Sequence, residues 1–381
     1  MSQTSESQSL PALVAQRAAA APGTTILRRK ARGIWKGASW AELTEQVQRI
    51  GAGLLDIGIA GGDSVAIIAE TRPETVYCDL AVQACGAASI VIHTDTEAPQ
   101  VEDILRATGT RVAFVEGEEQ LDKLLSLRAR CPALSRIVIF DMKGLREFRD
   151  PQCSGLEAFA GGSGGFSWTE AARKVRSDQV AVILFPKDGS GTGRTLTHRE
   201  ILQMIAGART RLGLQPRDER LAVLSMSDPV ERIWGLYAAL DSGCISNYLE
   251  SADTAAENLQ ELQPTVLGAD AEAWAHLHAT ATRAGKAATM VQRVLYDWAV
   301  QAGRGGGAGG AVANLLVLGA VRRELGLSKV RLAYTGGEPV SPQTLDWARS
   351  LGITIQRIED SAPGGDKPDR RTDPVMQRAH A

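Results

Sequence analysis

Two patterns of apolar residues alternate along most of this chain. Short runs of mainly apolar residues alternate with segments in which apolar residues recur every three or four positions, and these patterns predict buried strands and amphipathic helices. The predicted strands lie at residues 65–69, 88–92, 112–115, 137–140, 180–185, 221–224, 245–248 and 329–334. Strands and helices that alternate predict parallel sheets covered by helices on both faces. We therefore expect an α/β fold with two doubly wound parallel-sheet subdomains.

Local composition indicates where these subdomains begin and end. Residues 10–60 predict two helices around a short polar hairpin, and Ser39 is a good N-cap for the second helix. Residues 150–165 are rich in Pro, Ser and Gly, which favours a boundary or a surface loop. The end of the chain is polar and rich in Pro and Gly, which favours disorder. The expected division is a first subdomain at 1–168, a second at 169–358 and a disordered tail at 359–381.

The stretch from Asp178 to Glu200 holds the first candidate chemistry. An apolar run is followed by a loop of small residues, and Thr197 with Glu200 then forms a capping box at the start of a helix. Such a loop brings backbone N–H groups to a phosphate. No lysine follows the glycines, however, and the Walker pattern GxxxxGK[ST] is absent. The loop is either a phosphate-binding loop or an ordinary glycine-rich turn.

Composition narrows the function classes. The 381 residues are 44% hydrophobic and 23% charged, as in an ordinary soluble protein, and the net charge of −2 gives no electrostatic case for nucleic-acid binding. Five scattered cysteines without CxxC spacing favour reduced thiols over disulfides or a zinc site. The N-terminus lacks the layout of a signal peptide, and the longest apolar stretch, residues 311–321, is too short to span a bilayer. We expect a cytoplasmic protein without a transmembrane segment.

Several segments, in order along the chain, carry a resemblance to a known family. They include SWAELTEQVQRIGAGLLDIGIAGGDSVAI, ETRPETVYCDLAVQACGAASIVIHTDTEAPQVEDIL, SDPVERIWGLYAALDSG and VRRELGLSKVRLAYTGGEPVSPQTLDWARSLGI. The chain resembles the long-chain acyl-CoA synthetases, within the AMP-forming, adenylate-making ligases, over most of residues 10–358. The resemblance implies the fold of the N-terminal region of these enzymes, without their C-terminal domain. It also implies their chemistry, in which ATP and Mg²⁺ activate a fatty acid to an acyl-adenylate before transfer to coenzyme A.

The resemblance assigns candidate nucleotide-binding residues in two places. The family's phosphate loop is similar to YTSGTTGxPKG followed by LTH, and here the shorter run PKDGSGTGRT stands before Leu196-Thr197-His198. Arg194 takes the place of the family's lysine, although the two side chains are not interchangeable at a tight phosphate site. On the adenine side, the turn TGGEP matches the family's GGEP, or its glycines simply permit a strand-to-helix turn. The candidates are Gly189, Ser190, Gly191, Thr192, Gly193, Arg194, Gly336, Gly337 and Glu338.

Other family positions have changed. Asp228 stands where a histidine would fall in a PLSHVAER-like run, and is interpreted as a solvated turn residue. Glu272 replaces the arginine of the family's GVPRVW run. The family's YGxTE motif, whose Thr and Glu serve the phosphate and Mg²⁺, is missing after Ile358, where the chain continues with Glu359 and Asp360. We therefore assign no catalytic and no metal-binding residue.

Three hypotheses follow for function. We favour a non-catalytic relative that retains a pocket for a fatty acyl ligand or for ATP or AMP. It would act as a binding or regulatory partner, as a homo-oligomer or together with a full-length synthetase. The alternatives are an active ATP-dependent ligase, alone or complemented by another chain, and a truncated remnant of such an enzyme. The family implies Mg²⁺ as well, while the altered motifs leave coenzyme A in doubt.

Overall fold

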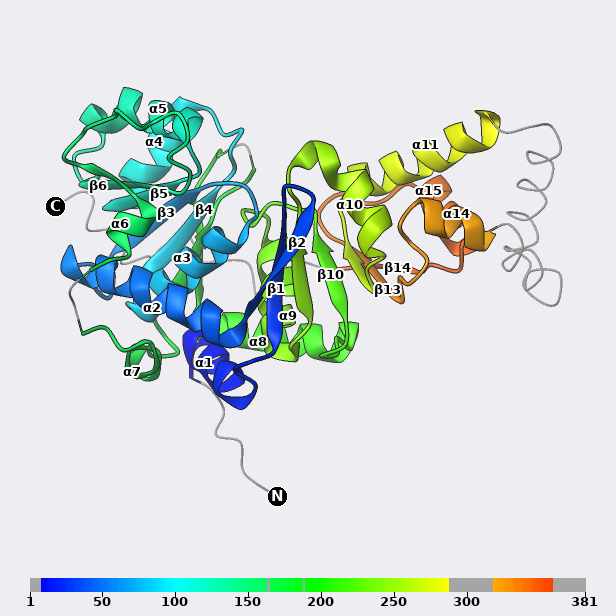
Figure 1. Ribbon diagram of the computed structural model, residues 1–381, viewed down its shortest axis with the longest axis horizontal. Coiled ribbons are helices and arrows are strands. Elements are labelled where there is room, and N and C mark those ends of the chain that lie inside the picture. Colours follow the sequence, from blue (N-terminus) through cyan, green and yellow to red (C-terminus); the bar gives the residue numbers. More distant parts are fainter. Residues whose placement is uncertain (1–7, 163–164, 188, 288–317, 359–381) are drawn as a thin grey trace, which may run out of the picture.

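Two seven-stranded sheets form the two halves of the molecule (Figure 1). The computed structural model describes residues 8–162, 165–187, 189–287 and 318–358. The predicted tail at 359–381 lies outside the described residues. Within the described residues, no helix is long and apolar enough to cross a membrane.

The first sheet has the strand order β7-β6-β5-β3-β4-β8-β9. All neighbouring strands are parallel except β8 and β9, which form an antiparallel hairpin at one edge. The strands are β3 (Ser64–Ile68), β4 (Ala88–Ile92), β5 (Val112–Val115), β6 (Arg136–Ile139), β7 (Cys153–Gly155), β8 (Val180–Leu184) and β9 (Arg194–Thr197).

The second sheet has the order β14-β13-β12-β10-β11-β1-β2. It is parallel except for the antiparallel hairpin of β1 and β2 at its edge. Its strands are β1 (Thr25–Ala31), β2 (Ile34–Ser39), β10 (Glu219–Ala222), β11 (Ile245–Tyr248), β12 (Val266–Gly268), β13 (Leu332–Thr335) and β14 (Ile355–Arg357).

Helices separate the sheets and cover their outer faces. The bounds are α1 (Leu10–Ala20), α2 (Trp40–Asp56), α3 (Pro73–Ala84), α4 (Ala98–Ala107), α5 (Glu118–Leu127), α6 (Leu156–Phe159), α7 (Trp168–Lys174), α8 (His198–Leu212), α9 (Ala238–Ser242), α10 (Ala255–Leu262), α11 (Ala271–Ala287), α14 (Gly319–Glu324) and α15 (Pro342–Ser350). A π-helical segment, Val230–Tyr237, runs directly into α9. Short 3₁₀ turns occupy Arg128–Arg130 and Ala252–Thr254.

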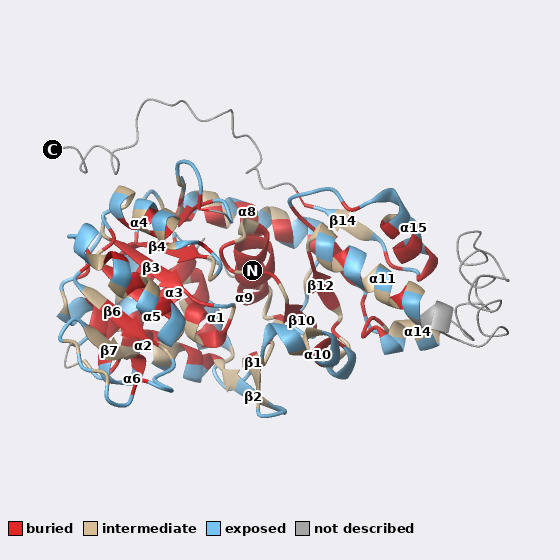
Figure 2. Cartoon of the chain, turned by 90° about the horizontal axis from the view of Figure 1, so that it is seen from above, coloured by how far each residue is buried: buried red, intermediate tan, exposed pale blue. Residues whose placement is uncertain are grey.

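Successive side chains of a strand pack alternately in the core between the two sheets and in an outer core on the far side of the sheet. In β3, Val65 and Ile67 pack in the core between the sheets, while Ala66 and Ile68 pack against the outer helices α4 and α5. In the second sheet, Tyr334 of β13 points into the central core and the preceding alanine into the outer one. Side chains on a strand point alternately to its two faces, so both faces of each sheet are buried. Figure 2 shows the buried strands between less buried outer helices.

The structure confirms the α/β class and corrects the predicted assignment of strands to the two sheets. The edge hairpins make both sheets mixed rather than wholly parallel. The predicted boundary at residue 168 does not separate the sheets, because β1 and β2 join the second sheet while β8 and β9 join the first. Residues 150–165 are also more than a loop, since they contain β7 and α6, and Leu156 and Phe159 are buried.

Candidate functional site

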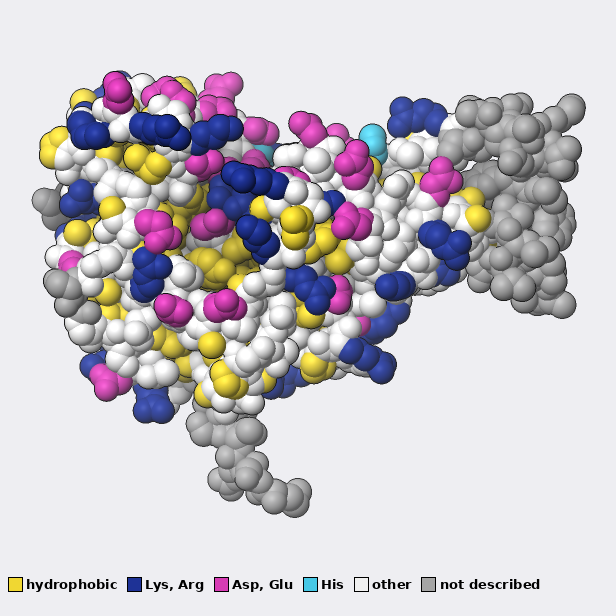
Figure 3. All heavy atoms as spheres, in the orientation of Figure 1, with side chains coloured by type: hydrophobic (Ala, Val, Ile, Leu, Met, Phe, Trp, Pro, Cys, Tyr) yellow, Lys and Arg dark blue, Asp and Glu magenta, His cyan; other side chains and the backbone are white. Residues whose placement is uncertain are grey.

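A cavity of about 760 Å³ lies where the carboxyl ends of strands from both sheets come together. The segments after β3, β4, β5 and β8 line it from the first sheet, and the segments after β10, β11 and β12 line it from the second. Ligands of open α/β sheets bind at the carboxyl ends of the strands, and this volume is typical of ligand sites. Figure 3 shows basic side chains gathered near the middle of one face, beside a hollow with hydrophobic side chains at its floor.

The candidate phosphate loop is the tip of the β8–β9 hairpin rather than a direct strand-to-helix connection. Thr192 and Arg194 line the cavity. Gly193 packs so closely on β8 that a Cβ atom there would lie 2.7 Å from Ile183 Cγ2. Gly189 has a φ of +72° and lies against Gln100 of α4, so it serves the turn.

Four of the six candidate loop residues are therefore not in the wall of the cavity. Gly189, Ser190, Gly191 and Gly193 are absent from its lining. Their part in nucleotide binding stays a prediction, because their backbone N–H groups do not line the cavity in which a phosphate would bind.

The candidate adenine turn lies after β13, and none of its three residues lines the cavity. A Cβ atom on Gly336 would lie 2.0 Å from Val230 Cγ2, so this glycine permits the close approach of the π-helical segment. Gly337 has a φ of +67°, a conformation that side chains rarely adopt, and Glu338 beside it is exposed. These facts support the turn interpretation of the glycines and leave adenine binding a prediction.

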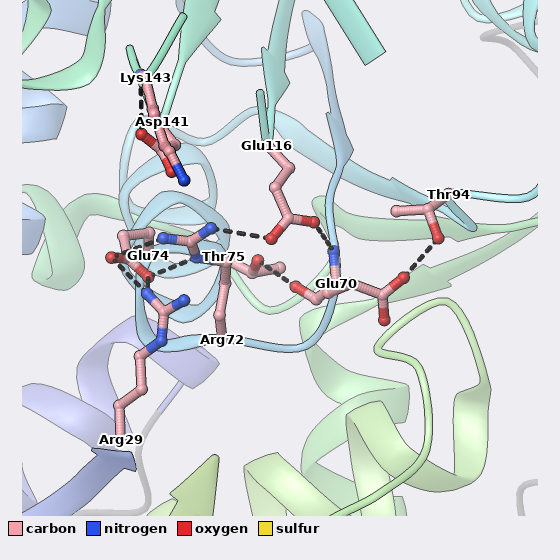
Figure 4. Close-up of polar contacts among 9 residues, drawn as sticks. All are labelled: Arg29, Glu70, Arg72, Glu74, Thr75, Thr94, Glu116, Asp141 and Lys143. Atoms are coloured by element: carbon pink, nitrogen blue, oxygen red, sulfur yellow. Dashed lines mark hydrogen bonds and ion pairs between the residues drawn. The ribbon is translucent and has the colours of Figure 1, made fainter. Parts of the chain in front are cut away.

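A cluster of ion pairs in the wall of the cavity was missed by the sequence analysis (Figure 4). Arg72 donates from Nε to Glu74 Oε2 at 2.8 Å and from Nη1 to Glu116 Oε1 at 2.8 Å. Arg29, from the second sheet, reaches Glu74 Oε1 at 3.2 Å. Burial raises the pKa of Glu74, but its contacts with Arg72 and then Arg29 outweigh burial and lower the pKa overall.

One signal in the sequence did point to this cluster. Arg72 and Glu116 lie just beyond the ends of predicted strands, and the carboxyl ends of parallel strands meet at one edge of a sheet. The position of Arg29 in this cluster could not be predicted from the sequence. Arg29 lies on a strand of the other sheet, and no local pattern places it beside Glu74.

Three further groups face the cavity from the first sheet. Glu70 accepts a hydrogen bond from Thr94 Oγ1 at 2.5 Å, as Figure 4 shows. Burial lowers the pKa of His93, and the nearby Lys187 ammonium lowers it further. Lys187 lies three residues after the end of β8, in the hairpin loop, and lines the cavity.

The second sheet contributes two acids to the cavity wall, and one of them, Asp228, stands where the resemblance implied a histidine. Asp228 lines the cavity, and its Oδ1 accepts from the backbone N–H of Val230 at 2.7 Å, as expected of a turn residue. Asp228 is partly buried, so it is less solvated than predicted. Asp270 also lines the cavity, and its Oδ1 accepts from Ala273 N at 2.7 Å at the start of α11.

Clusters of metal-ligand side chains were sought among the described residues. The described residues contain no group of three or more His, Cys, Asp or Glu side chains placed to hold a metal ion. His278 instead stacks on Trp347 with ring centroids 5.0 Å apart.

Buried charged groups join the two halves behind the cavity. Arg232 is fully buried, pairs with Asp79 of α3, and donates to Tyr237 Oη at 2.9 Å and to Ser89 Oγ at 2.8 Å. Tyr237 in turn donates to Asp79 Oδ2 at 2.6 Å. This network fixes the π-helical segment against the first sheet.

The comparisons with known proteins agree with this geometry. A family model described as AMP-binding enzyme matches residues 14–360. The chain is 26% identical over 366 residues to the long-chain-fatty-acid–CoA ligase FadD15 of Mycobacterium bovis, covering 92% of this chain and 60% of that protein. It is 24% identical to the peroxisomal long chain acyl-CoA synthetase 7 of Arabidopsis thaliana, covering 86% and 48%. The chain thus spans about half the length of the curated relatives it matches.

Solved structures support the same fold. The A-PCP didomain of the carboxylic acid reductase from Segniliparus rugosus, in complex with AMP, has a TM-score of 0.70 at 17% identity, over 93% of this chain and 53% of that one. The inhibitor-bound N-terminal domain of FACL13 from Mycobacterium tuberculosis has a TM-score of 0.62 at 16% identity, over 92% and 75%. At such identities the likeness shows the fold alone.

Proposed function

Because the chain belongs to the AMP-binding enzyme family, we propose that its cavity binds an adenine nucleotide or a fatty acyl-adenylate without completing acyl-CoA formation by itself. The observation that carries the proposal is the position of the cavity, which brings the hairpin residues Thr192 and Arg194 to the carboxyl ends of both sheets. Apolar residues such as Leu184, Phe185 and Leu249 give it the mixed lining of a small-molecule site.

The charges around the cavity argue against catalysis by these residues. Phosphoryl and adenylyl chemistry depends on cations and metal ions that stabilise charge in the transition state. Here the glycine loop ends without a lysine, and Asp228 and Glu272 stand where the family has a histidine and an arginine. Fold and chemistry are separable in this way.

We propose further that this chain, with its ligand bound, acts as a binding or regulatory partner. Its partner would be a second copy of itself, in a homo-oligomer, or a full-length synthetase. The acyl ligand is proposed from the fatty-acid–CoA ligase names of its relatives. Coenzyme A remains doubtful as a ligand of this chain.

ATP–pyrophosphate exchange with a panel of fatty acids tests the catalytic part of this proposal. We expect no exchange above a protein-free blank, because the glycine loop ends without a lysine and the acids Asp228 and Glu272 stand where the family has a histidine and an arginine. Exchange that is absent from Arg194→Ala but present in the parent chain would establish an active adenylating enzyme instead.

Thermal unfolding with ligands tests the binding part separately. A ligand that binds only the folded chain raises the melting temperature. We expect a fatty acyl-AMP analogue to raise it, and Thr192→Val or Arg194→Ala to reduce the shift. A chain that melts without cooperativity and without any shift would be the remnant rather than a binding protein.

A further inference from the structure

The outer edge of the second sheet presents backbone groups without a partner strand. The strand β2 ends this sheet, and among the described residues no strand pairs with its outer side. Arg32 and Gly33, with φ of +53° and +74°, form the two-residue turn of the β1–β2 hairpin. Next to such a turn the flanking residues exchange hydrogen bonds, and every second pair then does so. The N–H and C=O groups of Trp35 and Gly37 therefore point away from β1.

The β1–β2 hairpin is exposed but held in place. Figure 2 shows it extending from the second half of the molecule, with an exposed tip. The backbone N–H groups of Arg32 and Gly33 donate to the carboxylate of Glu250 at 2.5 and 3.1 Å. Ile34, next to the free edge, is 64% exposed and offers apolar contact. An exposed edge of this kind is a template on which an extended segment can add a strand.

The charge of the β1–β2 hairpin indicates what such a strand would carry. Residues 25–39 contain arginine and lysine but no acidic side chain. Carboxylates of other elements balance the cations of β1, in the ion pairs Arg28–Glu219, Arg29–Glu74 and Lys30–Glu261. Arg32 and Lys36 are exposed, and no carboxylate of the described residues forms an ion pair with either. The edge formed by β2 is therefore positively charged.

A second copy of the chain fits this edge poorly. Two copies of β2 make the most hydrogen bonds when they run antiparallel, with Trp35 of each copy opposite Gly37 of the other. That register places the two Lys36 side chains directly opposite each other, and like charges in this position destabilise strand pairing. A lysine on an edge strand protects against self-association in this way. The same lysine attracts a strand that carries a carboxylate at the opposite position.

From the free edge and its charge we propose that β2 binds an extended acidic segment of a partner protein as an additional antiparallel strand, with a carboxylate opposite Lys36. The backbone groups of Trp35 and Gly37 supply hydrogen bonds to any sequence, and Lys36 makes the site selective for acidic ones. The inference rests on the regulatory part of the proposed function, because it names the chemistry of the partner, and it does not depend on what the cavity binds.

Fluorescence anisotropy with a labelled peptide, acetyl-TVEVEVT-amide, tests the proposal on the purified chain. Its glutamates lie opposite Lys36 when its valines lie opposite Trp35 and Gly37. We expect saturable binding with a Kd below about 100 μM, and binding of acetyl-TVKVKVT-amide at least about tenfold weaker. Lys36→Glu should reverse this preference. The control Lys174→Glu changes an exposed lysine on α7 and should behave as the parent.

Methylation of the peptide backbone separates strand pairing from charge attraction alone. Methyl groups on the valine nitrogens remove the N–H groups that would bond to Trp35 and Gly37, so this peptide should not bind at the same concentrations. Methyl groups on the glutamate nitrogens, which point away from β2, should weaken binding much less. Both peptides keep the same charge, and the protein is unchanged in this comparison.

The remaining outcomes would overturn the proposal. These are the absence of peptide binding, equal binding of the acidic and basic peptides, and equal binding of the two methylated peptides. Attachment to phosphatidylglycerol vesicles that Lys36→Glu abolishes, without peptide binding, would assign the edge to a membrane surface. A dimer of the parent chain that excludes the peptide would assign it to a second copy. In each case, a melting temperature that still rises with a fatty acyl-AMP analogue would leave the ligand binding of the proposed function standing.

Discussion

At the scale of single residues, charge distinguishes this cavity. Arg72 is neutralised by two carboxylates, and Asp228 and Asp270 add negative charge at the carboxyl ends of the second sheet. Lys187 and Arg194 then supply the positive charge at the hairpin. Of the candidate residues on the hairpin, Thr192 and Arg194 line the cavity, and their part in nucleotide binding stays a prediction.

A buried histidine makes a residue-scale prediction about pH. His198 is buried at the start of α8, its Nδ1 accepts from Leu10 N at 3.4 Å, and burial lowers its pKa from 6.5 to about 4, against the opposing charge of Asp79. The unfolded chain therefore binds a proton more readily than the folded chain between these values. The contribution of His198 to stability should be full above pH 6.5 and be lost as the pH falls towards 4, by roughly 3 kcal/mol.

Urea unfolding of His198→Asn and the parent chain at pH 4.5, 5.5 and 7.5 measures this effect. The variant should lose less stability than the parent as the pH falls, because asparagine does not titrate. His276→Asn, which alters an exposed histidine on α11, is the control and should follow the parent. Equal losses in His198→Asn and the parent would contradict the prediction.

At the scale of elements, helix caps connect sequence to structure most directly. Thr197 ends β9 and caps α8: its Oγ1 accepts from Glu200 N at 3.3 Å, and Glu200 Oε2 accepts from Thr197 N at 2.7 Å. Ser39 and Glu42 form the same capping box at α2. Both caps were predictable, because the residues that form them are only three positions apart.

The cap of α8 gives an element-scale prediction. Thr197→Ala removes the side-chain acceptor for a backbone N–H group in the first turn, so we expect a loss of about 1 kcal/mol in the free energy of unfolding. Thr197→Ser keeps the hydroxyl group and should change it by less than about 0.5 kcal/mol. Chemical denaturation at neutral pH compares the three proteins, and similar values for Ala and Ser would contradict the capping role.

At the scale of the whole molecule, polar contacts hold the two halves around the cavity. Thr71, after β3, donates to the carbonyl of Leu224 at 2.9 Å and accepts from Met226 N at 2.8 Å in the segment after β10. Arg232 makes the deeper connection through Asp79. The cavity thus depends on contacts between segments about 150 positions apart in the chain.

We expect a large loss of stability when the buried ion pair between Arg232 and Asp79 is removed. Arg232→Met leaves Asp79 charged and buried with only Tyr237 and Gln83 as donors, so we expect unfolding to be easier by roughly 3–5 kcal/mol. Arg349→Ala breaks an exposed pair with Asp346 and should cost less than about 1 kcal/mol. The double variant Arg232→Met/Asp79→Leu should recover part of the free energy of unfolding that Arg232→Met loses. If the double variant is no more stable than Arg232→Met, an uncompensated charge on Asp79 is not the cause of the loss.

The sequence by itself determined the order of helices and strands, the caps of α2 and α8, and the family to which the fold belongs. Apolar periodicity and capping depend on residues a few positions apart, so they can be followed along the chain. Only the tertiary structure decided that β1 and β2 join the second sheet, that β8 and β9 join the first, and that Arg29 and Arg72 share Glu74. Strand pairing and ion pairing between distant segments depend on how the chain packs, and no local pattern contains that information.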